Sequence, residues 1–566
     1  MNNETKSNFL SELNNYFKQV IIFSESDNKI SDSIRLYSKN PEFSIKHFEI
    51  MSFGHVKRNE FIEKWVSLGQ RDILESNDLL KEIDRINRAI KPIIMQSYVP
   101  KFPIYLLVII KTIEAGKPHN FEKSSNAYYF EVLIKDSLTS LEIENSETDK
   151  VYQYLTDLAF EMYQQPNNSL ELEEWRNYHR NHLDYYDMTD DQLSFKEIRS
   201  KLENEKIIMN TTNGYEYKYS YMYYFFVAQY FARKINTENV KNIVSEMCRN
   251  IHETDNANII MFLTHLSKDE YIKNEVLSAA RKIFNNLPYL RLEEDIALIN
   301  DLCEEISPLV LNDVDVREHR RKLNEKMDIE EREKVTDADL EASASTQYSE
   351  EDDEASIVME QINIIDQGFK MLDIIGQILK NYYGSLSGED KYNLCEELFK
   401  LGLRINYSFI RSLSDNNQIL VEYISAIIIE KNLENNYERA EKMSKKILYS
   451  MGGFITFNSI SRIVSSVGTP DLDRTFHRVR EALSCNASDI TYLAIKLEYY
   501  DKFPHTEVKK FYQDNKNNKF VTQILQQMVR RYLYMYETNR AERQKICDLV
   551  GMRMSLKQKY QLNTKK

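Results

Sequence analysis

Apolar residues recur at intervals of three and four along most of the chain, which predicts a protein built mainly from α-helices. A long amphipathic helix is expected where six apolar residues keep this spacing, namely Val358, Ile362, Ile365, Phe369, Leu372 and Leu379. From about residue 390 to about residue 550, helical pairs recur roughly every 30 to 40 residues, a spacing typical of helical-repeat solenoids. We therefore expect helices over residues 236–327 and a helical-repeat array over residues 357–566.

Residues 190–235 break this pattern with two short runs of alternating residues. A helix around Phe195 should lead to a strand at Ile207–Met209, and the run Asn210–Gly214 has turn chemistry. Tyr215, Tyr217 and Tyr219 alternate as one face of a second strand should. We expect Ser220 to cap the following helix. Helix, hairpin and helix in this order predict a winged-helix-like segment over residues 166–235.

The N-terminal residues read as part of an α/β domain. Val20–Phe23 and Phe48–Ile50 are short β-type runs that follow a helical pattern. Two strands are too few for an independent sheet. We therefore interpret residues 1–55 as the remnant of a larger α/β domain, followed by helices over residues 56–165.

Composition supports the helical interpretation. The chain of 566 residues contains only 13 Gly and 10 Pro, where average usage would give about 40 and about 28. Sandwiches, barrels and glycine-rich α/β enzymes need more of both residues in their turns. The expected fold class is therefore mainly α.

Charge is concentrated in one segment. The net charge is −14, but residues 328–354 hold twelve acids against Arg332 and Lys334, so the rest of the chain carries only −4. Segments with this composition bury too little apolar surface to fold, and we predict an acidic disordered linker over residues 328–356. Because the rest of the chain is also slightly acidic, nonspecific DNA binding by the whole surface is disfavoured. The last forty residues are basic, with ten Lys or Arg against three acids.

Cysteines and termini favour the cytoplasm. Five cysteines lie far apart without a CxxC pair, as reduced structural thiols do. The N-terminus lacks a signal-peptide apolar region, and no apolar run approaches the ~20 residues that span a bilayer.

No catalytic signature is present in the sequence. A phosphate-binding loop needs G-x-x-x-x-G-K-[ST], and neither this motif nor a G-x-S-x-G elbow occurs. The one metal-like constellation is His252–Asp255 with His265, but its spacing departs from the i, i+4 pair of zinc hydrolases. We assign no catalytic, cofactor-binding or metal-binding residues, and a metal-dependent hydrolase remains the less favoured alternative.

Several blocks resemble the C-terminal part of bacterial STAND NTPases, the NLR-like signalling ATPases that include antiviral Avs-type proteins. These blocks are Phe48–Trp65, Tyr217–Phe231, His252–His265, Ile375–Gly384 and Leu401–Arg404. The resemblance implies a helical lid over residues 56–165, a winged helix and a helical sensor array, with the P-loop and the effector domain lacking. Many relatives carry a nucleotide-sensing His where this chain has Tyr221, which places nucleotide sensing in doubt.

The resemblance implies a non-catalytic sensor or regulatory module in antiphage defence. Its expected partners are a protein trigger and a separately encoded NTPase or effector subunit. Membranes are not expected as partners, and nucleic acid is disfavoured. Aromatic and Arg side chains anchor most protein interfaces. Those that we expect to bind the trigger are Tyr407, Arg411, Tyr499, Arg530, Arg531 and Tyr534. A helical-repeat scaffold or adaptor unrelated to NTPases is the alternative.

Overall fold

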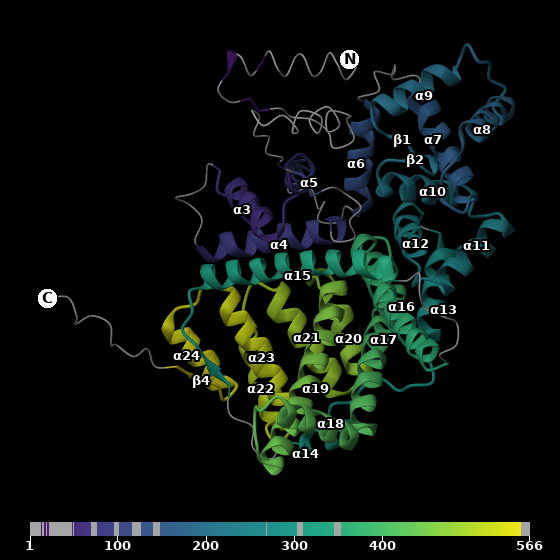
Figure 1. Cartoon of the computed structure of the whole chain (residues 1–566). Helices are drawn as coiled ribbons and strands as arrows, with labels where there is room; N and C mark the ends of the chain where they lie inside the picture. Colours follow the sequence, from purple (N-terminus) through teal and green to yellow (C-terminus); the bar gives the residue numbers. More distant parts are fainter. Residues whose placement is uncertain are drawn as a thin grey trace. The chain divides into compact units, whose positions relative to one another are not determined.

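Helices make up most of the described chain, as the periodicity predicts (Figure 1). The computed structural model describes residues 51–68, 76–94, 101–115, 126–139, 148–267, 269–302, 309–344 and 353–555, together with positions 13, 16, 17, 20, 21, 48 and 50. By its contacts the chain divides into two units, Met1–Ser52 and Phe53–Lys566. All the helices and strands from α3 to β4 belong to the second unit.

The first half of this unit carries a β-hairpin among its helices. Five helices precede the hairpin region: α3 (His55–Val66), α4 (Ser76–Ile94), α5 (Pro103–Ala115), α6 (Asn126–Thr139) and α7 (Thr148–Tyr163). The hairpin region follows: α8 (Leu172–Tyr185), α9 (Phe195–Asn204), β1 (Ile208–Thr211), β2 (Gly214–Tyr217) and α10 (Ser220–Lys234). Next come α11 (Glu238–Arg249), α12 (Thr254–Leu266), α13 (Glu270–Lys282), α14 (Ala297–Asp301) and the short strand β3 (Val310–Leu311).

The second half begins with two long helices, α15 (Val316–Ala344) and α16 (Asp353–Asn381). The C-terminal helices are α17 (Gly388–Asp415), α18 (Asn417–Glu430), α19 (Tyr437–Val467), α20 (Asp473–Leu483), α21 (Asn486–Tyr499), α22 (His505–Asn515), α23 (Lys519–Met535) and α24 (Arg540–Leu549). A 3₁₀ turn, η2 (Pro470–Leu472), and strand β4 (Arg553–Met554) complete the described elements.

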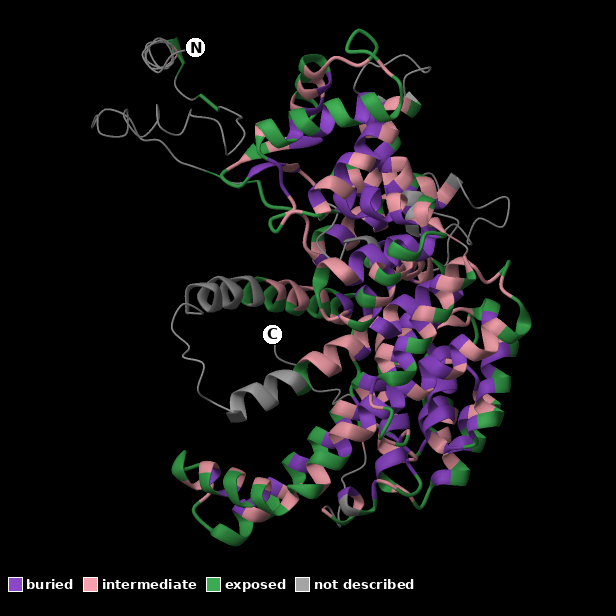
Figure 2. Cartoon of the chain, turned by 90° about the vertical axis from the view of Figure 1, so that its right-hand side faces the viewer, coloured by how far each residue is buried: buried purple, intermediate pink, exposed green. Residues whose placement is uncertain are grey.

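One apolar core runs from α3 to α24. Its largest fully buried side chains are aromatic, and they include Trp175, Tyr154, Phe225, Phe399 and Phe520. Figure 2 shows buried residues along the inner sides of the helices, with exposed residues on their outer sides and in the loops. Burial of this kind is what an amphipathic helix requires.

The predicted hairpin is confirmed. β1 and β2 are antiparallel, with Ile208 opposite Tyr217 and Thr211 opposite Gly214. Gly214, in the predicted turn, has φ +113°, a positive value that glycine adopts more readily than other residues. Tyr215 and Tyr217 are buried, so they form a packed face.

The helix cap was predicted one residue too late. Tyr219 is the N-cap of α10, Ser220 is its first helical residue, and no side chain bonds the cap. The ring of Tyr219 lies 6.4 Å from that of Tyr105 on α5, so the cap residue takes part in aromatic packing.

The prediction of strands before residue 52 finds no support at the positions that can be described. Val20, Ile21, Phe48 and Ile50 have no regular secondary structure and are exposed. The other residues of those two runs lie outside the described part of the chain.

The prediction of a disordered acidic linker is wrong for residues 328–344. These residues form the second half of α15, and Asp353 begins α16. Glu, Ala, Leu and Arg, which are frequent in this segment, are strong helix formers. Two of its acids also have partners far away in the sequence: Glu331 bonds to Lys101 and His55, and Asp328 bonds to the backbone at the start of α3.

A second, parallel pair of strands was not predicted. Val310 pairs with Arg553 and Leu311 with Met554, which ties the segment before α15 to the end of the described chain. The backbone N–H of Ser555 donates to the carbonyl of Leu311 at 2.9 Å. Two-residue strands carry no periodicity that a sequence pattern could reveal.

Candidate functional site: a polar junction around α15

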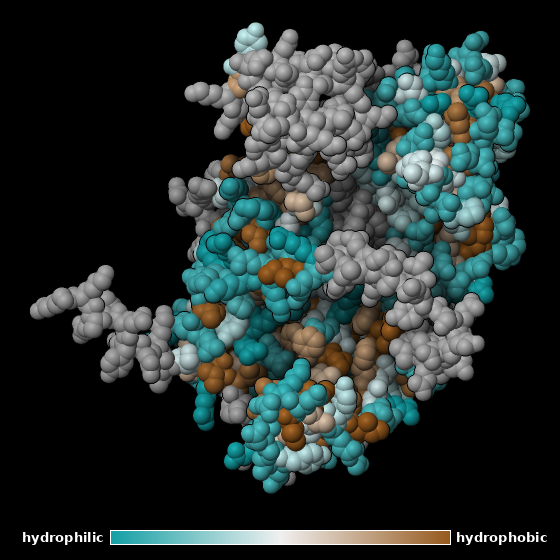
Figure 3. All heavy atoms as spheres, in the orientation of Figure 1, coloured by the Kyte–Doolittle hydropathy of each residue, from teal (hydrophilic) through white to brown (hydrophobic). Residues whose placement is uncertain are grey.

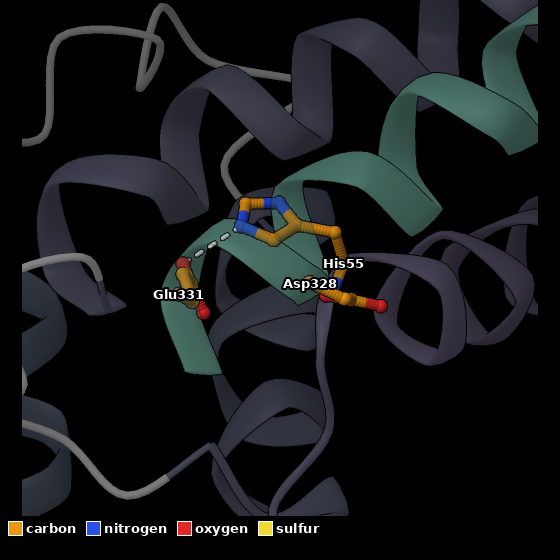
Figure 4. Close-up of side chains that lie close together, drawn as sticks. All are labelled: His55, Asp328 and Glu331. Carbon is orange, nitrogen blue, oxygen red and sulfur yellow. Dashed lines mark hydrogen bonds and ion pairs between the residues drawn. The ribbon is translucent and has the colours of Figure 1, made fainter. Parts of the chain in front are cut away.

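Helix α15 contacts α3 on one side and α23 on the other, and so links the N-terminal helices to the C-terminal helices (Figure 1). Five polar side chains meet where it crosses α3: His55, Arg58, Lys101, Asp328 and Glu331. We call this cluster the α3–α15 junction. Figure 4 shows His55, Asp328 and Glu331 facing one another across the two helices.

Asp328 caps α3 from a distant part of the chain. Its two carboxylate oxygens accept hydrogen bonds from the backbone N–H groups of His55 and Val56, the latter at 3.2 Å. The first N–H groups of a helix lack partners within it, and a carboxylate there also meets the positive end of the helix dipole. Gly54 makes this approach possible, because a Cβ atom at that position would lie 2.4 Å from an Asp328 oxygen.

His55 forms the centre of a hydrogen-bonded chain. Its Nδ1 accepts from the Arg58 guanidinium at 2.8 Å, which leaves the ring proton on Nε2 to donate to Glu331 at 2.8 Å. Lys101 donates to the other oxygen of Glu331 at 2.8 Å. The order Lys101, Glu331, His55, Arg58 therefore joins α15 to the start of α3 and to the segment that leads into α5.

Burial and the nearby Arg58 lower the pKa of His55, while Glu331 and Asp328 oppose the shift. Burial alone would raise the pKa of Glu331, but hydrogen bonds from Lys101 and His55 lower it. At neutral pH the arrangement thus holds a neutral imidazole between a guanidinium and a carboxylate. Protonation of His55 would place a proton on Nδ1 facing Arg58 and break that contact.

The geometry of the junction can also be compared with that of a metal site. His55, Asp328 and Glu331 each offer one ligand atom, and these atoms lie within 4.8 Å of one another. Each atom already has a hydrogen-bond partner, and both Arg58 and Lys101 bring positive charge to the cluster. These residues fit a hydrogen-bonded junction better than a divalent cation site.

A cavity of about 430 Å³ opens beside the junction. Its walls come from α3, α4, α15, α19, α21 and α23, so it lies between the N-terminal and C-terminal helices. Charged side chains of both signs line it: Arg58, Arg88, Lys91, Arg320, Arg531, Asp84, Glu330, Glu331 and Glu498. Phe457, Tyr532 and Tyr536 supply aromatic surface.

A buried ion pair crosses the cavity wall. Arg320 of α15 bonds both carboxylate oxygens of Asp84 on α4, one of them at 3.0 Å, and donates to the carbonyl of Met535 at 3.1 Å. The side chains of Arg320 and Asp84 are 7% and 15% exposed. A bidentate pair with an extra hydrogen bond gives the three helices a defined relative position.

Helix α4 also bonds directly to the ends of the C-terminal helices. Lys81 donates to the carbonyl of Asp501 at 2.7 Å, and Arg88 donates to the carbonyl of Glu498 at 3.0 Å. Asn77 donates to the carbonyl of Glu537 and accepts from its N–H at 2.8 Å. The junction is therefore held by specific polar contacts as well as by apolar packing.

One of the predicted partner-binding residues lines this cavity, and a second contacts a residue of its wall. Arg531 is exposed, lines the cavity and donates to Glu498 at 3.0 Å. The half-buried ring of Tyr499 lies under Arg88 at 4.8 Å, and burial raises its pKa. These residues were expected to face a partner, and here they join α21 and α23 to α4.

The other four predicted partner-binding residues do not line the cavity. Tyr534 is half-buried, and its hydroxyl accepts from the N–H of Asn312 at 3.1 Å. Arg530 is half-buried on α23. Tyr407 packs against the core, and Arg411 is exposed on α17.

The two histidines of the hydrolase alternative do not share a site with acids. His265 is buried, accepts from Asn381 at 2.7 Å, and burial lowers its pKa to about 3. The ring of His252 bonds to Gln367 at 2.9 Å. Within the described ranges, the residues grouped closely enough to hold a metal are those of the junction instead.

Sequence reasoning missed the junction because Asp328 and Glu331 were counted as charges of a linker. A usable signal was present, since Leu323 and Met327 keep helical spacing up to the start of the acidic run. The partners could not have been found in this way. His55 and Asp328 are 273 residues apart, and no local pattern connects them.

Residues 168–227 match the model of a family described as "Novel STAND NTPase 4". The match runs from just before α8 through β2 into α10, so this part of the chain is similar to that STAND NTPase family. It covers the hairpin and much of the block Tyr217–Phe231 that carried the resemblance. No curated protein and no solved structure matches the chain.

Tyr221, which stands where a nucleotide-sensing His was expected, lies within the matched residues. Its side chain is fully buried, with its ring 5.9 Å from that of Phe130.

As for membranes, none of the helices in the described ranges combines the length and apolarity needed to cross one.

Proposed function

We propose that this chain is a non-catalytic sensor and regulatory portion of a STAND-type NTPase that acts in antiphage defence in the bacterial cytoplasm. The observation that carries the proposal is the family match at residues 168–227. In this reading the C-terminal helices bind a protein trigger, and the α3–α15 junction passes the event to the helices before the matched region. A nucleotide-binding or effector subunit would be supplied by another part of the system.

The contacts around α15 support such coupling. A ligand shifts a conformational equilibrium only through contacts that differ between two states. Trigger binding near α21 or α23 would alter the contacts of Glu498, which bonds to Arg88 of α4, and of Met535, which bonds to Arg320 of α15 and through it to Asp84 of α4.

The test is capture of a trigger followed by measured binding. The chain is incubated with lysates of phage-infected and uninfected bacteria, and a protein enriched only after infection is purified and titrated. We expect binding that persists at about 0.3 M salt, where the screening length is short. Arg531→Ala should weaken it by about tenfold or more, as an interface anchor does. The matched control is Arg321→Ala, an exposed Arg on α15.

Two results would contradict the proposal. One is recovery of nucleic acid alone, lost at 0.3 M salt, because phosphate contacts weaken steeply with salt. The other is saturable, magnesium-dependent ATP binding at micromolar affinity, which would make the chain a nucleotide-binding subunit itself. Hydrogen exchange with the trigger bound should change protection at α3 and α15, and unchanged protection would refute the role of the junction.

A further inference from the structure

Exposed apolar side chains gather on one helical hairpin, formed by α18 and the first half of α19. Eight large hydrophobic residues between 419 and 454 are 39% to 68% exposed: Ile419, Tyr423, Leu433, Tyr437, Met443, Ile447, Met451 and Phe454. From residue 455 to residue 555, where every residue is described, no large hydrophobic side chain is comparably exposed. Figure 3 shows brown side chains among hydrophilic ones over the lower part of the molecule, where α18 and α19 lie in Figure 1.

Four of these residues form a stripe on α19. Met443, Ile447, Met451 and Phe454 follow one another at intervals of four, four and three residues, which places them on one helical face. The stripe is about 16 Å long at 1.5 Å per residue. We call these four residues the α19 stripe. Spacing of this kind on a helix normally marks a face that packs against another helix.

The hairpin has a small interior of its own. Ser425 of α18 and Ser444 of α19 are buried and bonded to each other at 2.9 Å. Val421, Ile428 and Leu448 are buried as well, yet none of them belongs to the main core. In Figure 2 a helical hairpin with mainly exposed and intermediate residues stands out at the lower left. Two helices with so little shared interior leave apolar surface for a further partner.

Charge on the hairpin is balanced. Residues 417–454 contain five acidic and five basic side chains, so their net charge is zero. Several of the charges are paired within the hairpin, as in Lys442–Glu438 at 3.1 Å and Lys445–Glu441 at 2.6 Å. A neutral apolar surface offers nothing to a nucleic acid or an anionic membrane, and it suits a protein surface of the same kind.

The distribution of charge along α19 selects an antiparallel arrangement of two copies. Lys442, Lys445 and Lys446 flank the start of the stripe, while residues 447–461 contain no charged side chain. Residues 438–446 hold four basic side chains against two acidic ones, so a parallel pair would place two positive segments together, and like charges in contact are unfavourable. An antiparallel pair places the lysines of each copy beside the uncharged end of the other.

We propose that the α18–α19 hairpin is a self-association surface that pairs two copies of this chain through their α19 stripes, antiparallel and related by a twofold axis. In this pair Met443 of one copy meets Phe454 of the other, and Ile447 meets Met451. Two hairpins joined in this way form a four-helix arrangement with a shared apolar interior. The contact is isologous, so it closes at a dimer rather than growing into a filament.

The size of the surface sets the expected affinity. A stripe of four side chains with its surroundings falls at the low end of known interfaces, below about 800 Å² for each partner. Interfaces of this size are weak and transient, and we expect a dissociation constant in the micromolar range. The apolar contact should change little between 0.1 and 0.5 M salt, because it does not depend on opposite charges.

Sedimentation of the full chain tests the proposal. Between 1 and 100 µM protein, wild type should shift from monomer towards dimer at both salt concentrations. Ile447→Glu should keep the chain monomeric over this range. Tyr423→Ser is the matched control, because Tyr423 lies on the side of α18 that faces away from α19 and is 65% exposed. This variant should dimerise as wild type does, and circular dichroism should show both variants folded.

Cysteine pairing tests the orientation. A mixture of Met443→Cys and Phe454→Cys chains should form a disulfide-linked dimer, and either variant alone should not exceed the wild-type background. A wild-type chain that stays monomeric at 100 µM would overturn the proposal. A dimer that Ile447→Glu leaves intact, or that is lost at 0.5 M salt, would place the contact elsewhere. Efficient linking of Met443→Cys chains with one another would refute the antiparallel arrangement.

Discussion

Removal of the Asp328 carboxylate should loosen the start of α3 without unfolding the chain. Asp328 is the cap of this helix, supplied from α15, and its oxygens accept from the first two N–H groups. Loss of an N-cap side chain costs about 1 kcal/mol, within a range of 0.5 to 2. Loss of a negative charge at a helix N-terminus costs a further 0.3 to 1 kcal/mol. For Asp328→Ala we therefore expect about 1.5 kcal/mol of local destabilisation.

Hydrogen exchange measures this loss at the right place. When opening is fast compared with exchange, the rate of an amide scales with its opening constant, and 1.4 kcal/mol corresponds to a factor of ten. The amides of His55 and Val56 should exchange about ten times faster in Asp328→Ala than in wild type. Asp328→Asn keeps one accepting oxygen but loses the charge and the second acceptor, so we expect a factor of about two to five, between wild type and Asp328→Ala.

Glu325→Gln is the matched control, one turn earlier on the same helix. Its carboxylate pairs with Arg321 at 3.0 Å and is 46% exposed, so its removal should change exchange at α3 by less than a factor of two. Equal exchange rates at His55 in Asp328→Ala and Glu325→Gln would refute the cap. The cap would also be refuted if Asp328→Asn proved as damaging as Asp328→Ala.

Three further changes test the packing around the junction and core. Arg320→Met should lower the free energy of unfolding by about 2–3 kcal/mol in urea, because it removes the ion-pair partner of Asp84, whose side chain is only 15% exposed; adding Asp84→Asn should recover part of the loss, and no recovery would contradict this account. Gly376→Ala should cost about 1–3 kcal/mol, since its Cβ would lie 2.3 Å from a backbone carbonyl of α19. A Cβ added at Gly388 would have no other heavy atom within 4 Å, so Gly388→Ala should be neutral or slightly stabilising in the same assay. Equal costs for the two glycine substitutions would argue against the close approach at Gly376. Burial lowers the pKa of His265 to about 3, so below about pH 6.5 the unfolded chain binds a proton that the native chain does not. Stability should therefore fall as pH drops from 6.5, by up to about 1.4 kcal/mol per pH unit, and His265→Gln should flatten this slope in thermal unfolding between pH 7 and 5. An unchanged slope would mean that other groups govern the acid response.

Local patterns sufficed for the class of the fold and for one supersecondary unit. The three- and four-residue spacing predicted helices that the structure contains, because each amphipathic face must be buried against a neighbour. Gly214 and the alternating tyrosines located the hairpin of β1 and β2, because turn chemistry and side-chain alternation are properties of adjacent residues. This is also the region that matches a known family.

The acidic segment shows where composition misleads. Its charges predicted disorder because a charged segment is expected to stay in water. In the structure Glu331 meets Lys101 and His55, and Asp328 meets the end of α3. Whether a charge is solvated or paired depends on side chains more than two hundred residues away, and net charge over a window contains no information on them.

Helical spacing also leaves open which apolar face is covered. Phe369 and Phe454 both lie on regular apolar stripes, and the sequence alone cannot tell that the first packs against the core whereas the second is 67% exposed. The sequence by itself determined the helices, the hairpin and their order, since these follow from interactions between near neighbours along the chain. The tertiary structure alone decided the α3–α15 junction, the β3–β4 pair and the exposed α19 stripe, because each depends on which distant segments come into contact.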